Sequence, residues 1–240
     1  MIKTRKQKAA LLALAVVLAL AIGCGVYVGD YYRAEEGAVA HSEAVTVEIT
    51  GDRAVFMPEE PRAGLIFYPG GKVEFTAYAP LMTALAEEDI LCVLVKMPFH
   101  LAVLDMDAAE GIPAEYPEVE RWYLGGHSLG GSMAAGYAAK QAEDYEGLIL
   151  LAAYSTADLT DTGLEVLSLY GDRDQVLNRE KYEQYRPNLP ESTLETVIEG
   201  GNHANFGFYG PQEGDGESTI SRQEQQAATV EAVRNLIFGE

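Results

Sequence analysis

The chain has 240 residues, 48% of them hydrophobic, so it can bury one sizeable core but is short for two domains. The formal net charge is −20. Four of the 17 basic residues lie in the first eight positions, which leaves 13 basic against 37 acidic residues and a net charge of −24 for the remainder. This balance argues against nucleic-acid binding and against docking on anionic lipid through a basic patch.

The N-terminal segment has the pattern of a membrane anchor. Residues 1–8 are basic, and residues 9–28 carry no charge over a length that matches a hydrocarbon core of about 30 Å. Because the positive residues precede the apolar run, we expect the following domain to lie outside the cytoplasmic membrane. We therefore predict a single-pass signal anchor over 1–29 and a polar tether over 30–43.

Two other fates of this segment are compatible with the sequence. The stretch Ala21 to Cys24 loosely resembles a lipobox, so Cys24 could be acylated in a lipoprotein. Ordinary signal cleavage would instead release a secreted protein. The other cysteine, Cys92, lies in an apolar run, and we expect it to be a small buried residue without a disulfide.

The rest of the chain, 44–240, has the pattern of one α/β domain. Residues 44–50 and 53–57 flank the Gly51-Asp52 turn and predict an antiparallel hairpin at a sheet edge. Beyond them, short apolar runs alternate with helical patterns. The expected strands are 65–68, 90–95, 122–124, 148–151, 164–170 and 193–199, and the expected helices are 78–88, 128–142, 180–185 and 221–238. Such alternation predicts a mostly parallel, twisted sheet with helices on both faces.

A serine motif lies between the strand at 122–124 and the helix at 128–142. The sequence Gly126-His127-Ser128-Leu129-Gly130 matches the G-x-S-x-G nucleophile elbow, in which a sharp turn lifts the serine hydroxyl clear of the sheet. The flanking glycines allow the chain to cross closely at the turn. Ser128 is therefore the candidate nucleophile.

Candidate partners of this serine follow later strands, because open parallel sheets place their chemistry at the carboxyl ends of strands. Asp172 and Asp174 follow the strand at 164–170, and either could orient a histidine. His203 follows the strand at 193–199 in a Gly-rich loop and is the candidate base. The order serine, aspartate, histidine is that of a hydrolase triad.

Oxyanion donors are expected from two backbone segments. The amide of Leu129 opens the helix after the serine. The turn after residues 65–68 supplies either Gly71 or Lys72 as the second donor.

These features together resemble the α/β-hydrolase superfamily over roughly Val45 to Gly239. The resemblance is to its lidless, dienelactone-hydrolase-like branch of bacterial proteins, often membrane-anchored or exported. It rests on FYPGGKV (67–73), VKMPFHLAV (95–103), GGHSLGG (125–131) and GGNHANFG (200–207). In that family the acid usually stands three residues after a glycine, which implies Asp174 ahead of Asp172. Dienelactone hydrolases proper have a cysteine nucleophile where this chain has Ser128.

The motif set predicts a serine hydrolase that cleaves a carboxylic ester or thioester through an acyl-enzyme, without cofactor or metal. Because residues 154–163 are too few to build a large cap, we expect a small or medium acyl substrate. Two alternatives remain open at this point: an acyltransferase with the same triad, and a non-catalytic exported binding protein on a hydrolase scaffold.

Overall fold

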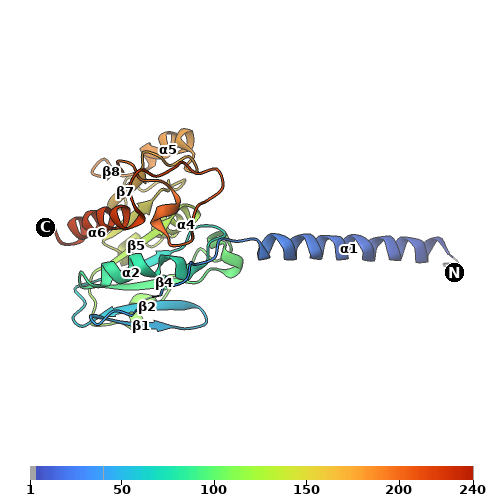
Figure 1. Ribbon diagram of the computed structural model, residues 1–240, viewed down its shortest axis with the longest axis horizontal. Coiled ribbons are helices and arrows are strands. Elements are labelled where there is room, and N and C mark those ends of the chain that lie inside the picture. Colours follow the sequence, from blue (N-terminus) through green and yellow to red (C-terminus); the bar gives the residue numbers. More distant parts are fainter. Residues whose placement is uncertain (1–3, 40, 240) are drawn as a thin grey trace. The chain divides into compact units, whose positions relative to one another are not determined.

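The structure is a computed structural model that describes residues 4–39 and 41–239. It divides into two compact units, Met1–Tyr31 and Tyr32–Glu240. Figure 1 shows the helices and strands of both units.

The first unit is the helix α1, Arg5–Gly29. Thr4 and Gln7 begin it with a capping box, in which each side chain accepts the other residue's backbone N–H. The stretch Gln7–Gly29 is long and apolar enough to cross a membrane, and none of its apolar window is buried. A signal sequence near an N-terminus has the same properties. The predicted N-terminal transmembrane or signal helix is therefore present.

The second unit contains eight strands and the remaining helices of the described residues. The strands are β1 (Val45–Ile49), β2 (Arg53–Pro58), β3 (Ala63–Tyr68), β4 (Ile90–Val95), β5 (Trp122–His127), β6 (Gly147–Leu151), β7 (Glu165–Gly171) and β8 (Leu194–Ile198). The α-helices are α2 (Ala79–Ala86), α3 (Ile112–Glu115), α4 (Leu129–Ala138), α5 (Arg179–Tyr185) and α6 (Arg222–Phe238). Short 3₁₀ helices are η1 (Phe75–Tyr78), η2 (Pro98–His100), η3 (Ala102–Leu104), η4 (Ala142–Asp144), η5 (Arg186–Asn188) and η6 (Ala204–Phe206).

One sheet holds all eight strands in the order β1-β2-β4-β3-β5-β6-β7-β8. β2 is antiparallel to both of its neighbours, and the pairs from β4 through β8 are parallel. The expected edge hairpin and parallel sheet are therefore confirmed. Because β3 and β5 are adjacent in the centre, the turns that follow them meet at one edge of the sheet.

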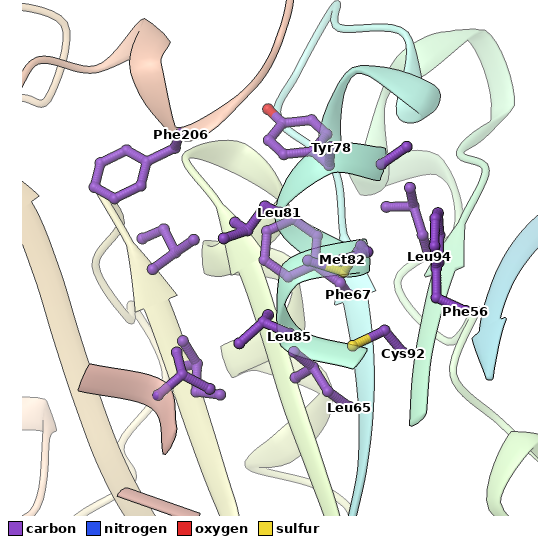
Figure 2. Close-up of a cluster of buried hydrophobic side chains, with 14 of the residues drawn as sticks. Phe56, Leu65, Phe67, Tyr78, Leu81, Met82, Leu85, Cys92, Leu94 and Phe206 are labelled. Atoms are coloured by element: carbon purple, nitrogen blue, oxygen red, sulfur yellow. The ribbon is translucent and has the colours of Figure 1, made fainter. Parts of the chain in front are cut away.

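Helices cover both faces of this sheet. Successive residues of a strand point to opposite faces. On one face Leu65 and Phe67 of β3 pack with Leu81, Met82 and Leu85 of α2, as Figure 2 shows. The same cluster includes residues of α6. On the other face, Ile66 and Tyr68 belong to a second cluster with the alanines of α4. Small side chains on α4 let it approach the sheet closely.

Some boundaries differ from those expected. The helix predicted over 128–142 ends at Ala138, and η4 follows. The pattern at 78–88 divides into η1 and α2. Cys92 is fully buried in β4, and burial raises the pKa of its thiol. Both cysteines are free.

Backbone hydrogen bonds join the first residues of the predicted tether to the domain. The N–H of Tyr32 donates to the carbonyl of Lys72 at 2.8 Å, and the N–H of Glu74 donates to the carbonyl of Tyr32 at 2.8 Å. Ala38 is buried as well. The domain therefore begins to form contacts directly after Tyr31.

Candidate active site

Ser128 occupies the turn between β5 and α4 in a strained conformation. Its φ is 53° and its ψ is −122°, a region that residues with side chains rarely adopt. Its own N–H donates to the carbonyl of Leu151 at 2.9 Å, which fixes the turn to β6. The side chain is half-buried. This is the strand–turn–helix context that gives the elbow motif its meaning.

Glycines make the crossing at this turn sterically feasible. A Cβ on Gly126 would lie 2.6 Å from the backbone N of Gly131. A Cβ on Gly130 would clash with the carbonyl oxygens of Tyr68 and Pro69 at the end of β3. Any side chain at these two positions would therefore push α4 away from the sheet.

Asp174 and His203 form a buried pair. Nδ1 of His203 lies 2.8 Å from Oδ2 of Asp174, and both side chains are almost fully inaccessible. The other oxygen of Asp174 accepts the N–H groups of Val176 at 2.8 Å and Leu177 at 2.7 Å. Both carboxylate oxygens are thus engaged, and Nε2 is the His203 nitrogen left for other chemistry.

Asp172 has a different position. Its Oδ1 accepts the N–H of Gly200 at 2.7 Å and lies 3.8 Å from Nε of Arg173. It therefore braces the start of the loop that carries His203. The geometry brings Asp174, not Asp172, to the imidazole.

The loop of His203 is held beside the elbow. Asn202 donates its N–H to the side chain of Gln225 at 2.9 Å, and that side chain returns a hydrogen bond to the Asn202 carbonyl at 2.8 Å. The ring of His203 lies 4.4 Å from the ring of His127, centroid to centroid, and His127 directly precedes Ser128. Among the described residues, no hydrogen bond joins the Ser128 hydroxyl to His203. In ligand-free sites such bonds are often long and shorten on substrate binding.

The two turns expected to hold the oxyanion lie against each other. A Cβ on Gly71 would come within 2.9 Å of the Leu129 side chain, so the backbone at Gly71 touches the start of α4. The first amides of a helix have no partner within that helix, which leaves the Leu129 N–H available. The N–H of Lys72 already donates to the carbonyl of His100 at 2.8 Å. Of the two alternatives, Gly71 rather than Lys72 is therefore the candidate second donor.

A buried tyrosine, which no sequence motif indicates, links these turns. The Tyr78 hydroxyl accepts the N–H of Gly70 at 3.1 Å and lies 2.7 Å from Nδ1 of His127. It thus connects the turn after β3 with the end of β5. Burial, and next the nearby His203, hold the pKa of His127 well below its ordinary value, which favours the neutral imidazole in this hydrogen bond with the Tyr78 hydroxyl. Nε2 of His127 is buried without a hydrogen-bond partner.

A cavity of about 330 Å³ opens beside Ser128. Its other lining residues are Leu129, Ser132, Met133, Ala152, Ala153, Tyr154, Thr156, Val176, Leu177 and Asn178. Apart from the Tyr154 phenol, no ionisable side chain lines it, so it suits a neutral, partly apolar group. A cavity of about 500 Å³ between α3 and α4 lacks Ser128, Asp174 and His203.

No group of three or more His, Cys, Asp and Glu side chains suited to a metal ion occurs in the part of the chain that the structure describes.

Comparison with known protein families identifies the family of the chain. A family model described as "Alpha/beta hydrolase family" matches residues 64–227, and the chain belongs to that family. The sequence matches none of the curated proteins.

Several solved structures have a similar fold. The chain is similar to a predicted CIB-like hydrolase from Thermoplasma acidophilum, with a TM-score of 0.59 and 15% identity over 80% of this chain and 99% of that one. It is similar to carboxyl esterase 2 from the mycorrhizal fungus Tuber melanosporum, with a TM-score of 0.62 and 13% identity over 87% and 90%. It is also similar to Est1E from Butyrivibrio proteoclasticus, with a TM-score of 0.58 and 15% identity over 81% of this chain and 99% of that one. At these identities the likeness shows the fold.

The neutral state of His127 makes a specific contribution to the pH dependence of stability. Because its folded pKa is depressed, the unfolded chain binds a proton that the folded chain does not once pH falls below about 6.5. His127 therefore stabilises the fold fully above that pH and loses this contribution as pH falls. The free energy of unfolding of the native chain should fall more steeply below pH 6.5 than that of His127→Gln, by up to about 1.4 kcal/mol per pH unit. Denaturant unfolding between pH 4.5 and 7.5 measures this difference.

The matched control is His41→Gln, the same substitution at an exposed position, which should leave the free energy of unfolding at pH 7.5 unchanged. Equal slopes for the native chain and His127→Gln would contradict a neutral, buried His127.

The Tyr78 hydroxyl should matter for both stability and turnover. Tyr78→Phe leaves the Gly70 N–H and Nδ1 of His127 unpaired in the interior, which should cost about 1–3 kcal/mol of stability. Because the Gly71 amide then loses its support, kcat should fall about tenfold with little change in KM. Tyr68→Phe is the control, since that buried hydroxyl also makes two backbone hydrogen bonds, to Met106 and Ala109. It should lose stability and keep kcat; an equal loss of kcat in both variants would contradict this role.

Proposed function

We propose that the protein is a serine hydrolase that cleaves a small or medium carboxylic ester or thioester through an acyl-enzyme. The single observation that carries this proposal is the buried Asp174–His203 pair held beside the strained Ser128 turn. In the proposed assignment Ser128 is the nucleophile, His203 the general base and Asp174 the residue that orients His203.

The reaction would begin when the Ser128 hydroxyl turns to Nε2 of His203 as substrate binds. His203 takes the hydroxyl proton while the serine oxygen attacks the carbonyl carbon, and Asp174 stabilises the imidazolium. The carbonyl oxygen gains the negative charge and faces the amides of Leu129 and Gly71 at the N-terminal end of α4. When the intermediate collapses, His203 protonates the departing alcohol or thiol. His203 then removes a proton from water, which attacks and releases the acyl group.

Hydrolysis is favoured over acyl transfer by the open site. The segment from β6 to β7 contains no helix or strand within the described residues, so no cap covers the cavity from there. An acyl-enzyme that water can reach is hydrolysed unless the site excludes water. The uncharged cavity lining is consistent with a neutral ester.

The proposed location is the outer side of a bacterial cell membrane, with α1 as a single-pass anchor. Support comes from the length and apolar composition of α1 and from the basic residues before it. Assignment to the dienelactone-hydrolase-like branch rests on the sequence resemblance and stays a prediction.

Covalent labelling tests the nucleophile. A fluorophosphonate probe should label the native chain at Ser128, and Ser128→Ala should abolish the label and lower kcat on p-nitrophenyl acetate by roughly 10⁶-fold. Ser132→Ala is the matched control, because Ser132 lines the same cavity and its hydroxyl donates to the carbonyl of Tyr154. Labelling that persists in Ser128→Ala, or fails in the folded native chain, would refute the assignment.

Acyl-chain preference tests the absence of a cap. Across p-nitrophenyl esters from acetate to palmitate, kcat/KM should be highest for the short and medium chains, because a cavity of about 330 Å³ cannot enclose a long chain. The series is measured with detergent-solubilised full-length protein, with Ser128→Ala as the blank. A preference for palmitate over acetate would overturn the proposed substrate range.

A further inference from the structure

Three exposed apolar side chains lie together in one short segment. Phe99, Val103 and Leu104 are 61%, 55% and 55% exposed, more than any other large hydrophobic residue outside α1 among the described residues. They belong to η2 and η3, which follow β4. We call residues 97–104 the apolar rim. Exposed apolar groups gathered in this way typically mark a surface that contacts something else.

The backbone of the apolar rim is held in an unfavourable conformation. Phe99 and His100 have φ values of 52° and 59°, and consecutive bulky residues rarely adopt this region. Hydrogen bonds from His100 to the Met97 carbonyl and from Leu101 to the Pro98 carbonyl, each 3.0 Å, fix the bend. The exposure of Phe99 is therefore built into the fold, because the surrounding contacts over-determine it.

The apolar rim is attached to the candidate active site. The carbonyl of His100 accepts the N–H of Lys72 at 2.8 Å, which joins the rim to the turn that carries Gly71. Lys72 in turn accepts the N–H of Tyr32 through its own carbonyl at 2.8 Å. The rim, the candidate oxyanion turn and the beginning of the domain are thus consecutive in a chain of backbone hydrogen bonds.

The connection to α1 limits how far this region can lie from a membrane. Only Asp30 and Tyr31 separate the last residue of α1, Gly29, from Tyr32. Three Cα–Cα steps span at most about 11 Å, whatever the direction of α1. The polar layer of one leaflet is roughly 5–8 Å thick. If α1 crosses a bilayer, Tyr32 and the turn bonded to it lie close to the lipid headgroups.

We propose that the apolar rim is a membrane-contact surface. Its side chains Phe99, Val103 and Leu104 lie in the headgroup layer of the bilayer that α1 crosses. The Ser128 site then opens at the membrane surface. This inference rests on the proposed anchor function of α1. The contact is apolar rather than electrostatic, because the chain beyond residue 8 carries a net charge of −24 and the exposed Asp105 and Asp107 adjoin the rim. A bilayer of zwitterionic lipid is therefore the fitting occupant.

Site-specific fluorescence on the full chain in phosphatidylcholine vesicles tests this contact. In a Cys24→Ser background, with Cys92 fully buried, Leu104→Cys and Leu194→Cys each receive an NBD label. The pair is matched, because Leu104 is 55% and Leu194 is 52% exposed, while Leu194 begins β8 and so lies at the amino ends of the parallel strands, opposite to the carboxyl ends that carry the site. We expect doxyl-labelled lipid to quench the label at 104 at least twofold and to leave the label at 194 unchanged.

A third protein, labelled at native Cys24, reports whether α1 is inserted. Quenching at Cys24 and at 104 but not at 194 supports the proposal. Quenching at Cys24 with equal, unquenched signals at 104 and 194 overturns it, and so does the absence of quenching at Cys24. Blue-shifted emission at 104 without quenching would indicate burial against a second copy of the chain and would also overturn it. Quenching at 104 that needs added phosphatidylglycerol would overturn the apolar contact.

These outcomes are separate from the hydrolase proposal. Fluorophosphonate labelling of Ser128 in the same vesicles reports the nucleophile and depends on neither label position. The membrane-contact proposal can therefore be refuted while the assignment of Ser128 as nucleophile is supported, and the reverse can also occur.

Discussion

The site depends on one close crossing, where α4 leaves the sheet directly over the carboxyl end of β3. Gly130 touches the carbonyl oxygens of Tyr68 and Pro69, and Gly126 touches the first turn of α4. Ser128 has its strained conformation at this crossing, and the start of α4 packs against Gly71. The local strain is stable because the strand pairs on both sides of β5 and the small side chains of α4 fix the backbone around it. Packing around the turn therefore stabilises the strained backbone that positions Ser128.

A second layer supports this crossing from within the core. Tyr78 comes from η1, on the face covered by α2 and α6, and reaches both the turn after β3 and His127. A charged His127 there would face the ring of His203, so burial of a neutral imidazole removes a competing positive charge from the neighbourhood of the proposed base. Two histidines in contact can therefore have separate roles, because one is kept neutral by the core and the other is bonded to a carboxylate.

Much of the fold could be predicted from the sequence, because its signals are local. Apolar runs, glycines and helical periodicity indicated the strands, the edge hairpin and the strand–turn–helix unit at Ser128. The sequence does not indicate Gly71 over Lys72 as the second candidate oxyanion donor. That distinction depends on the hydrogen bond from the Lys72 N–H to the carbonyl of His100, 28 positions further along. The sequence does not indicate the role of Tyr78, because a tyrosine in a helical pattern is typical of an ordinary core residue. The family resemblance indicated Asp174 over Asp172 from spacing, and the structure supplies a physical difference: Asp172 bonds Gly200, while Asp174 bonds the imidazole.

The acidity of the chain bears on what leaves the site in the proposed reaction. A neutral ester feels little force from a surface with a net charge of −24, but the carboxylate released from it is repelled. The cavity beside Ser128 offers no cationic side chain that would retain this anion. Charge repulsion therefore favours release of the acid product without a moving lid. Physiological salt, which screens charges beyond about 8 Å, would weaken this repulsion. The excess of carboxylates on the chain therefore favours release of the negatively charged product over its rebinding.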